Sequence, residues 1–565
     1  MVDEMAIQEK IEYDPATSSV WGYATLPVPV REDKVLATHG LVYMLCGVAT
    51  RWKQVVAYHY TGDSFSGVDA GNVLLTIIEK CSSIGLDVVA VTTDMGSGNR
   101  SMWQYFKINS GKHGCVANIA KHPALNGKEI RFMADVPHIV KNLCGHLLKE
   151  HQIVLHPDDV SKNNLNGCAV YLKPSKELVT HQEGSVFKLA PKLRKEVIDP
   201  SHFDRMKVSN AMVIFSHSTA VALRTMVKEH GWPEHYLVTA WFIEQVNRWF
   251  DLMCSRHPVM ALSKHDMTKY QEALTFLKNF MEMFSRLKIG NGHCKPSQAG
   301  VSLSTTSILE LQRHLLENKK FDFVLTSRFT QDSLENFFST IRMRNPIPTP
   351  LELKMALKII SVSQYLKVCA KGSYEVDDGA FFLADFNISK ENTVPVDDTE
   401  RDSLTFGKPH LTTTDSSAFF YYCGYIVSRV VKNNTTCEQC RTILTGGNNT
   451  FAGVSDFTTQ KCYQTGTLVY PSDVVYNLLL TCEGCFTKAI EQCLELDDII
   501  PTLQHTMMGA VKDINMPVCH DVKNKLIRRF CHARLQLHLS DLTRKSNKKT
   551  KDMGSKSMCA PRRQK

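Results

Sequence analysis

The sequence contains no apolar run long enough to cross a membrane. The best runs, such as Leu41–Val48, are about half of the roughly 18 residues that a membrane helix requires. The first residues, Met1–Met5, lack the basic start and the apolar stretch of a secretory signal. These absences argue against a membrane or secreted protein, and they predict that the 18 cysteines are reduced thiols and not a disulfide framework.

Long-range repeats are also missing, and most of the chain has no excess of charge. Of its 565 residues, 43% are apolar and 22% are charged, which excludes a largely disordered or fibrous protein and predicts two to four domains. Nearly all of the formal net charge of +9 lies in Arg544–Lys565, which holds nine basic residues and one acidic residue. We expect this segment to be a disordered tail that serves nuclear import or phosphate contact, or one that only raises solubility.

Strand and helix patterns alternate in residues 1–150. Three segments rich in β-branched and aromatic residues come first, then a helix-patterned segment at 67–85 and two short apolar strands that end at Asp94 and Asp135. The first three segments are Val20–Leu26, Leu41–Val48 and Trp52–Tyr60. This order predicts a mixed α/β sheet whose acidic residues lie just past the strand ends.

The pattern changes after residue 150. Residues 151–320 are mostly helix-patterned and predict a large all-α insertion, and residues 321–371 return to the α/β domain with an amphipathic helix at Gln331–Met343. An acidic linker is expected at 372–415, a small Cys-rich and mostly helical C-terminal domain at 416–542, and the basic tail at 543–565. The predicted fold is therefore an α/β domain in two parts, 1–150 and 321–371, with a helical insertion between them.

Three carboxylates lie at positions suited to metal-dependent catalysis. Asp3 lies on a short strand, Asp94 follows a strand, and Glu335 shares one face of the amphipathic helix with Asp332. Converging carboxylates can hold two Mg²⁺ ions about 3.5–4 Å apart, one to activate a water or 3′-hydroxyl and one to stabilise the leaving oxygen. The pattern alone does not select these residues among 57 acidic ones, because each could be a solvated strand-end or helix-cap residue, and it leaves Asp94 and Asp135 equivalent.

Four motifs carry a resemblance to a known family. They are VDEM at Val2–Met5, TDMGSGN at Thr93–Asn99, ADVPHIVKN at Ala134–Asn142 and LTSRFTQDSLENFF at Leu325–Phe338. In this order they resemble the motifs of the P-element transposase family, including its THAP-domain relatives in animals. The match runs from residue 1 to about residue 365, and a weaker similarity continues to about residue 540.

The resemblance implies an RNase H-like catalytic domain interrupted by a helical nucleotide-binding insertion. By position, Asp3, Asp94 and Glu335 match the catalytic carboxylates that bind Mg²⁺ or Mn²⁺. Asp135 and His138 match a segment whose role is structural or supporting. The resemblance thus separates Asp94 from Asp135, which the pattern alone does not.

The resemblance also implies a binding site for GTP, a cofactor that this family uses without needing its hydrolysis. Lys188 would face phosphate, Val208 the base, and Asn247 and Asp251 the purine or ribose edge, with Asp332 touching the same site. The sequence has no glycine-rich phosphate loop of the GxxxxGK type, so a GTPase-type site is not supported. Lys188 and Asp251 could instead be ordinary surface charges.

The beginning of the chain departs from the family pattern. Full-length members begin with a zinc-coordinating THAP DNA-binding domain and a coiled coil, and only two residues precede Asp3 here. We therefore expect an N-terminally truncated transposase, with Asp3 on a frayed terminus. Its expected partners are the transposon ends and target DNA in the nucleus, with homo-oligomerisation when full length. The alternatives are a catalytically silent, transposon-derived nuclear DNA- or protein-binding protein and an unrelated RNase H-like nuclease.

Two CxxC pairs in the C-terminal domain predict a structural zinc site. Two-residue spacing lets both thiolates of a pair reach one tetrahedral Zn²⁺ ion. The pairs are Cys437 with Cys440 and Cys482 with Cys485, and His520 offers a further ligand. The gap between the pairs is longer than in a typical zinc ribbon, and reduced thiols packed in a small core are the alternative.

Overall fold

The computed structural model describes residues 1–15, 17–27, 35–110, 115–201, 207–291, 294–369, 409, 411–433, 437–447, 453–462, 468–494, 499–516 and 520–558. Most of the predicted acidic linker lies outside these residues. The described chain forms two compact units. The first contains residues 1–179, 192–227 and 232–369, and the second contains residues 180–191, 228–231 and 409–558.

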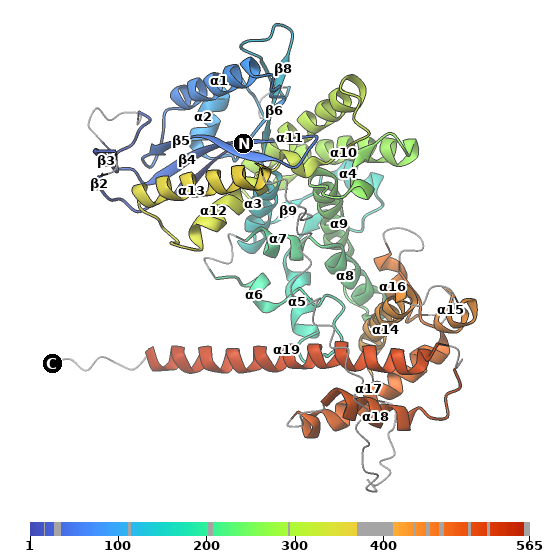
Figure 1. Ribbon diagram of the computed structural model, residues 1–565. Helices are drawn as coiled ribbons and strands as arrows, with labels where there is room; N and C mark the ends of the chain where they lie inside the picture. Colours follow the sequence, from blue (N-terminus) through green and yellow to red (C-terminus); the bar gives the residue numbers. More distant parts are fainter. Residues whose placement is uncertain are drawn as a thin grey trace, which may run out of the picture. The chain divides into compact units, whose positions relative to one another are not determined.

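A six-stranded mixed sheet lies at the centre of the first unit (Figure 1). Its strand order is β5-β4-β1-β6-β8-β7, in which β1 is antiparallel to β4 and parallel to β6, and β6 is parallel to β8. The strands are β1 (Val2–Ala6), β4 (His39–Cys46), β5 (Lys53–Thr61), β6 (Ala90–Thr93), β7 (Ile119–Lys121) and β8 (Glu129–Ala134). The predicted mixed sheet is confirmed, and Asp94 and Asp135 directly follow two of its parallel strands. A separate hairpin pairs β2 (Glu12–Asp14) with β3 (Ser19–Trp21).

Strand β1 is held along its whole length. All five of its residues pair with β4, with Asp3 opposite Val42, and the Met1 amine donates a hydrogen bond to the Met44 carbonyl at 2.9 Å. Asp3 is only 6% exposed. The prediction that Asp3 lies on a frayed terminus is therefore wrong, because the neighbouring strand satisfies the backbone of β1 even though few residues precede it.

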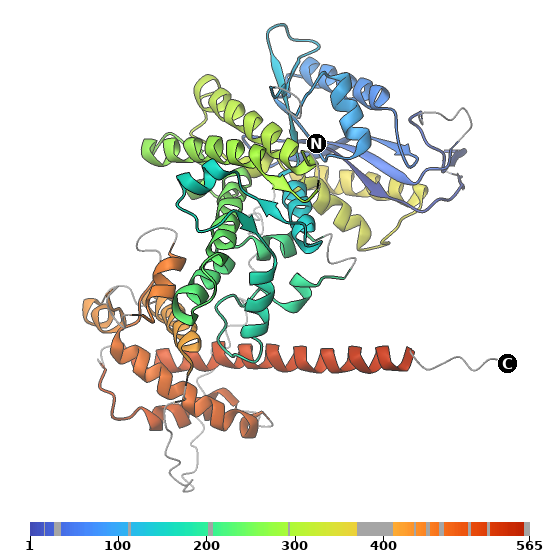
Figure 2. The same cartoon turned by 180° about the vertical axis from the view of Figure 1, so that it is seen from behind.

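Helices cover both faces of this sheet (Figures 1 and 2). On one face, Met5 and Val42 pack into an apolar cluster with Phe338 of α12 (Asp332–Arg342) and Leu353 of α13 (Pro350–Cys369). On the other face, the Tyr43 hydroxyl donates to the Ala70 carbonyl of α1 (Gly67–Ser83), which packs with α2 (Ser97–Tyr105). Successive strand residues point to opposite faces, so Asp3, opposite Val42, lies on the face that α12 covers.

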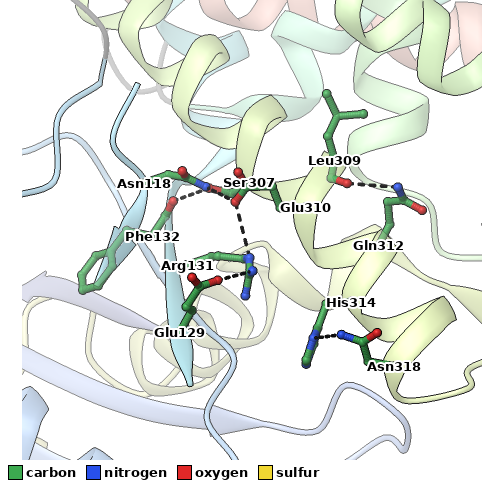
Figure 3. Close-up of polar contacts among 10 residues, drawn as sticks. All are labelled: Asn118, Glu129, Arg131, Phe132, Ser307, Leu309, Glu310, Gln312, His314 and Asn318. Atoms are coloured by element: carbon green, nitrogen blue, oxygen red, sulfur yellow. Dashed lines mark hydrogen bonds and ion pairs between the residues drawn. The ribbon is translucent and has the colours of Figure 1, made fainter. Parts of the chain in front are cut away.

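Helix α11 (Pro296–Arg313) packs against β8 through a set of polar contacts (Figure 3). Asn118 donates to Ser307 Oγ at 3.0 Å and to Glu310 at 2.9 Å, and Ser307 donates to the Phe132 carbonyl at 2.6 Å. The Arg131 guanidinium lies 3.4 Å from Glu310. Although the sequence places α11 within the helical insertion, these contacts make it a supporting layer of the sheet.

The remainder of the first unit is mostly helical, as predicted. Helix α3 follows β8, and the later elements include long helices and short strands. They are α3 (Val136–Leu148), β9 (Ile153–Val154), α4 (Pro157–Lys162), β10 (Ala169–Val170), α5 (Lys173–His181), α6 (Lys195–Ile198), α7 (Val208–Ile214), α8 (His217–His230), α9 (Tyr236–Met253), β11 (Leu262–Ser263), α10 (Met267–Arg286), β12 (Lys288–Ile289) and β13 (Phe323–Val324). Among the described residues, none of the helices combines the length and apolar character needed to span a membrane.

The second unit is built mainly from six helices in its described C-terminal part. They are α14 (Thr413–Asn433), α15 (Glu438–Leu444), α16 (Asp456–Lys461), α17 (Asp473–Cys493), α18 (Ile499–Ala510) and α19 (Val522–Met558). The basic segment was predicted to be disordered from residue 543, but the backbone of α19 continues to Met558 (Figure 1). The polar composition of this segment predicts disorder, but α19 is already nucleated by upstream residues. Extending a helix that has formed costs little, so the helix continues into the segment.

Candidate active site

The sheet register places Asp3 beside Asp94. Strand β1 is parallel to β6 with Val2 opposite Thr93, so Asp3 and Asp94 come next on the two neighbouring strands. One oxygen of Asp94, Oδ1, accepts hydrogen bonds from the Gly96 amide at 2.9 Å and from the Asn99 side chain at 2.5 Å. A Cβ at Gly96 would lie 3.1 Å from the same oxygen, so the tight approach of this turn favours glycine.

Glu335 approaches the two aspartates from α12. It lies in the first turn of that helix, whose apolar side packs on the same sheet face as Asp3. His138 Nε2, at the beginning of α3, lies 3.5 Å from Glu335 Oε1, and Arg342 lies 3.8 Å from Glu335 Oε2. The structure therefore brings the three predicted catalytic carboxylates to one region, although Glu335 is more than 240 residues from the other two in sequence.

The electrostatics of this region show an accumulation of negative charge. Burial, followed by the charges of Glu335 and Asp94, raises the pKa of Asp3 to about 8. The hydrogen bond with His138 lowers the pKa of Glu335. Burial alone would lower the pKa of His138, but the hydrogen bond with Glu335 and the charge of Asp135 raise it. A bound cation would offset both the burial and the repulsion that raise the pKa of Asp3.

The donor set fits a hard divalent cation. Carboxylate oxygens are the ligands that Mg²⁺ and Mn²⁺ prefer, and the buried Asn99 Oδ1 beside Asp94 has no hydrogen-bond partner among the described residues. One oxygen from each of the three carboxylates cannot be chosen so that all three atoms lie within 4.8 Å of one another. Such spacing is compatible with two ions. Because two ions about 3.5–4 Å apart span a wider region than one ion, their carboxylate ligands need not converge on a single position.

Asp135 differs from Asp94 in that both of its oxygens are used by the backbone. One oxygen accepts from the His138 amide at 3.1 Å and caps α3, and the other accepts from the Gln331 amide at 2.7 Å. The Gln331 side chain in turn donates to the Val2 carbonyl at 2.6 Å. Asp135 and Gln331 thus fix the beginning of α12 against β1, which agrees with the structural role that the resemblance implied for Asp135.

Sequence reasoning missed two polar residues of this site, Asn99 and Gln331. Both are buried and both lie within the motif strings that carry the family resemblance. Their position within those strings is the available signal, because buried amide side chains are usually hydrogen-bonded and so tend to fix the structure around them. The periodicity of the segments gave no reason to prefer these amides over their neighbours.

Replacing Asp135 by asparagine is expected to destabilise the first unit by about 1–3 kcal/mol. Asparagine keeps one acceptor oxygen, so either the His138 or the Gln331 amide loses its buried partner. Urea unfolding of the full chain measures the loss, and Asp63→Asn on the exposed surface is the matched control. A midpoint equal to that of the control would contradict the positioning role.

The residues predicted to bind a nucleotide fall in both units. In the first unit, the Asn247 side chain of α9 accepts from the His217 amide at 3.3 Å and donates to Asp251 at 2.8 Å. Arg256 donates to Asp332 at 2.5 Å. Burial is the main cause of the raised pKa of Cys254, and the charges of Asp135, Asp332 and Asp251 add to it.

The other two predicted nucleotide contacts are Val208 and Lys188. Val208 is half-buried and begins α7, which packs against α3, as α9 does. Lys188 is half-buried and belongs to the second unit. Trp249, near Asn247 on α9, is buried and stacks on Phe280 with ring centroids 5.3 Å apart, so it is a core residue.

A charged cluster on α8 and α9 supports the polar residues around Asn247. Glu244 accepts hydrogen bonds from His217 Nδ1 at 3.1 Å and from both terminal nitrogens of Arg224. Burial opposes ionisation of Glu244, but these hydrogen bonds and charges lower its pKa to about 2. The cluster holds α8 against α9 where Asn247 and Asp251 project.

The stability of the first unit is therefore expected to depend on pH through Glu244. Because its folded pKa lies below its unfolded pKa of about 4.5, its contribution is complete above that value and is lost as pH falls toward 2. Between pH 5 and pH 3, we expect the free energy of unfolding of the natural chain to fall by about 1–2 kcal/mol more than that of Glu244→Gln. Urea unfolding at several pH values measures the slopes, and parallel slopes would contradict the prediction.

The cysteines of the second unit group differently from the prediction. Cys437 and Cys440 come together with His520, and the three ligand atoms all lie within 4.8 Å of one another. Cys482 and Cys485 are buried within α17 and do not belong to this group, so the predicted four-cysteine site is wrong. Burial raises the pKa of Cys482 well above its ordinary value and that of Cys485 to about 11, as expected for packed thiols.

The mixed sheet, with carboxylates from β1, the end of β6 and a later helix, defines the first unit as an RNase H-like domain with a helical insertion. Family models agree with this. "TNP-like, RNase H N-terminal domain" matches residues 1–107, and "TNP-like, GTP-binding insertion domain" matches residues 145–291. "DNA transposase THAP9, C-terminal domain" matches residues 410–549.

Individual relatives give the same result. The chain is 26% identical over 481 residues to the "Transposable element P transposase" of Drosophila melanogaster, a match that covers 79% of this chain and 57% of that protein. It resembles the solved "Drosophila P element transposase strand transfer complex" with a TM-score of 0.54 at 23% identity, over 66% of this chain and 76% of that one. The chain thus spans little more than half the length of the relative. The three family models and the relative agree in their similarity to transposases of the P-element type.

Proposed function

We propose that this chain is a DNA transposase of the P-element type, which cleaves a phosphodiester bond and joins a freed 3′-hydroxyl to target DNA. The observation that carries the proposal is the convergence of Asp3, Asp94 and Glu335 beside the central strands β1 and β6. The similarity to a P-element transposase whose solved complex is a strand transfer complex supports DNA as the partner.

Asp3, Asp94 and Glu335 would hold the divalent ions, Mg²⁺ or Mn²⁺. Such ions activate the attacking water or 3′-hydroxyl and stabilise the leaving oxygen. His138 orients Glu335 through the contact between Nε2 and Oε1. Asp135 and Gln331 keep α12 against β1, so Glu335 stays directed toward Asp3. Gly96 and Asn99 fix the orientation of Asp94 through its Oδ1, which leaves Oδ2 available to a ligand.

GTP would bind in the insertion as a cofactor and not as a substrate for hydrolysis. The Asp251 carboxylate, oriented by Asn247, is suited to accept hydrogen bonds from the polar edge of a guanine or a ribose. Arg256 beside Asp332 offers a positive charge close to the same group of residues. Phosphate contact by Lys188 stays a separate prediction, as does nuclear localisation.

Asp251→Ala is expected to weaken GTP binding at least about tenfold, since a hydrogen bond to a charged group contributes about 1.5–3 kcal/mol. Isothermal titration calorimetry of the full chain with GTP measures the affinity. Asp322→Ala, at an exposed position of the same unit, is the control. Equal affinity of Asp251→Ala and the natural chain would remove Asp251 from the nucleotide site.

Nicking of a supercoiled plasmid tests the proposed function without knowledge of the transposon ends. The natural chain, incubated with Mg²⁺ or Mn²⁺ and GTP, is expected to convert supercoiled DNA to the nicked form and to join a 3′-hydroxyl oligonucleotide to the plasmid. Chelation of the divalent ions should abolish both products. A folded, DNA-binding chain that forms neither product would support the catalytically silent alternative and refute the enzyme.

A further inference from the structure

Two segments of the second unit that are distant in sequence meet at a cluster of metal-ligating side chains. Cys437 is the residue just before α15, Cys440 lies in the first turn of that helix, and His520 lies two residues before α19. Cys440 Sγ lies 3.5 Å from His520 Nδ1, across a separation of 80 residues. Cys440 is buried, Cys437 is half-buried and His520 is exposed, so the cluster is open to solvent on one side.

The spacing of the three ligand atoms fits a tetrahedral zinc ion. With Zn–S bonds of about 2.3 Å and Zn–N bonds of about 2.0–2.1 Å, tetrahedral angles place sulfur and nitrogen about 3.6 Å apart and two sulfurs about 3.8 Å apart. The 3.5 Å between Cys440 and His520 matches the first value, and the 4.8 Å limit on the group admits the second. Two thiolates and one imidazole are also a ligand set that zinc prefers.

We propose that Cys437, Cys440 and His520 bind a structural Zn²⁺ ion that fastens the beginning of α19 to α15. They supply three of the four ligands that a tetrahedral ion takes. This site shares one CxxC pair with the four-cysteine site expected from the sequence, and it replaces the other pair with a histidine from a different segment.

The scaffold around the cluster holds the ligands in place through other contacts. On the α15 side, Ser472 donates to the Ile443 carbonyl at 2.5 Å, and the Gly446 amide donates to the Tyr470 carbonyl at 2.9 Å. On the α19 side, Val522 is buried, and Lys523 donates to the Ile514 carbonyl at 2.9 Å. The ion would therefore bind a largely formed site, and removing one ligand should leave the unit folded.

The proposed ion would restrain the position of the first turn of α19. That helix carries Arg528, Arg529 and Arg534 and leads into the basic segment of the chain. Its first turn already packs through the buried Val522 and through Lys523, which donates to the Ile514 carbonyl at 2.9 Å. A metal link to a segment 80 residues earlier would fix the origin of this basic helix.

Metal analysis of the full chain tests the proposal. The chain is reduced, supplied with zinc in an excess of Mg²⁺ that occupies the carboxylates, and dialysed before zinc is measured by mass spectrometry. Cobalt substitution, read by its thiolate charge-transfer absorption, reports whether sulfur binds the ion. The test variants are Cys437→Ser and His520→Ala, and the matched controls are Cys485→Ala, from the other CxxC pair, and His505→Ala, at an exposed histidine.

The natural chain and both controls are expected to retain about one zinc per chain and to show the cobalt–thiolate absorption. Cys437→Ser and His520→Ala should bind zinc at least about tenfold more weakly in competition with a chelator while keeping their helical circular dichroism. A folded natural chain that holds no zinc would overturn the proposal. So would zinc that is retained in both test variants, or that is lost in the folded Cys485→Ala control.

Discussion

Replacing Asp94 by asparagine is expected to reduce metal-dependent nicking and strand transfer by at least about 100-fold, because removal of one charge-stabilising group from a catalytic site typically costs about 10²–10³ in rate. Asp94 is the residue that the register of β1 and β6 places beside Asp3. Asparagine keeps the Oδ1 that accepts from Gly96 and Asn99 but removes the negative charge that a divalent ion needs. Plasmid nicking rates in Mg²⁺ and in Mn²⁺ measure the effect.

The same substitution should leave the fold intact, and this separates catalysis from stability. The midpoint of urea unfolding should change little, since both hydrogen bonds to Oδ1 can persist. Asp63→Asn, at an exposed aspartate of the same unit, controls for the loss of one charge. If Asp94→Asn and the natural chain nick DNA at equal rates, the carboxylates of this site do not carry the chemistry.

Arg534→Met is expected to destabilise the second unit by about 3–5 kcal/mol, the typical cost of leaving a buried charge without its partner. Arg534 and Glu483 are 3% and 2% exposed, and the Arg534 Nε donates to both carboxylate oxygens, at 3.1 Å and 2.9 Å. Burial raises the pKa of Glu483, and Arg534 opposes that shift. The guanidinium also lies 4.3 Å from the centre of the Phe486 ring. Hydrogen exchange of α17 and α19 measures the loss of protection.

A double variant distinguishes the loss of the ion pair from a general disturbance of the core. Combining Arg534→Met with Glu483→Gln removes both charges, and this should recover much of the stability that Arg534→Met loses. Arg528→Met, at an exposed position of the same helix, should change the protection of α17 little. Equal protection in Arg534→Met and Arg528→Met would show that the pair does not hold α17 to α19.

The sequence located the catalytic carboxylates only with the help of family motifs. Asp94 and Asp135 follow neighbouring parallel strands at equivalent register positions, so strand patterns alone could not separate them. Their difference lies in contacts from distant segments. Asp135 accepts the amide of Gln331, 196 residues away, whereas the described hydrogen bonds of the Asp94 carboxylate come from its own turn.

The zinc ligands show a second limit of sequence reasoning. CxxC spacing is present in both cysteine pairs, but α17 continues through Cys482 and Cys485 and buries them, while Cys437 and Cys440 lie where α15 begins. Local spacing does not report whether a pair falls within a helix or at its end. His520 joins the first pair through tertiary packing that no local pattern encodes.

The claim that Asp3, Asp94 and Glu335 together bind divalent ions is tested most directly by locating manganese in crystals of the natural chain. Anomalous scattering from crystals grown with Mn²⁺ identifies each bound ion independently of activity. We predict manganese between the three carboxylates, bridging Asp3 to at least one of the other two, and its loss in Asp94→Asn crystals. Ordered manganese elsewhere in the crystal, with none at these carboxylates, would contradict the account.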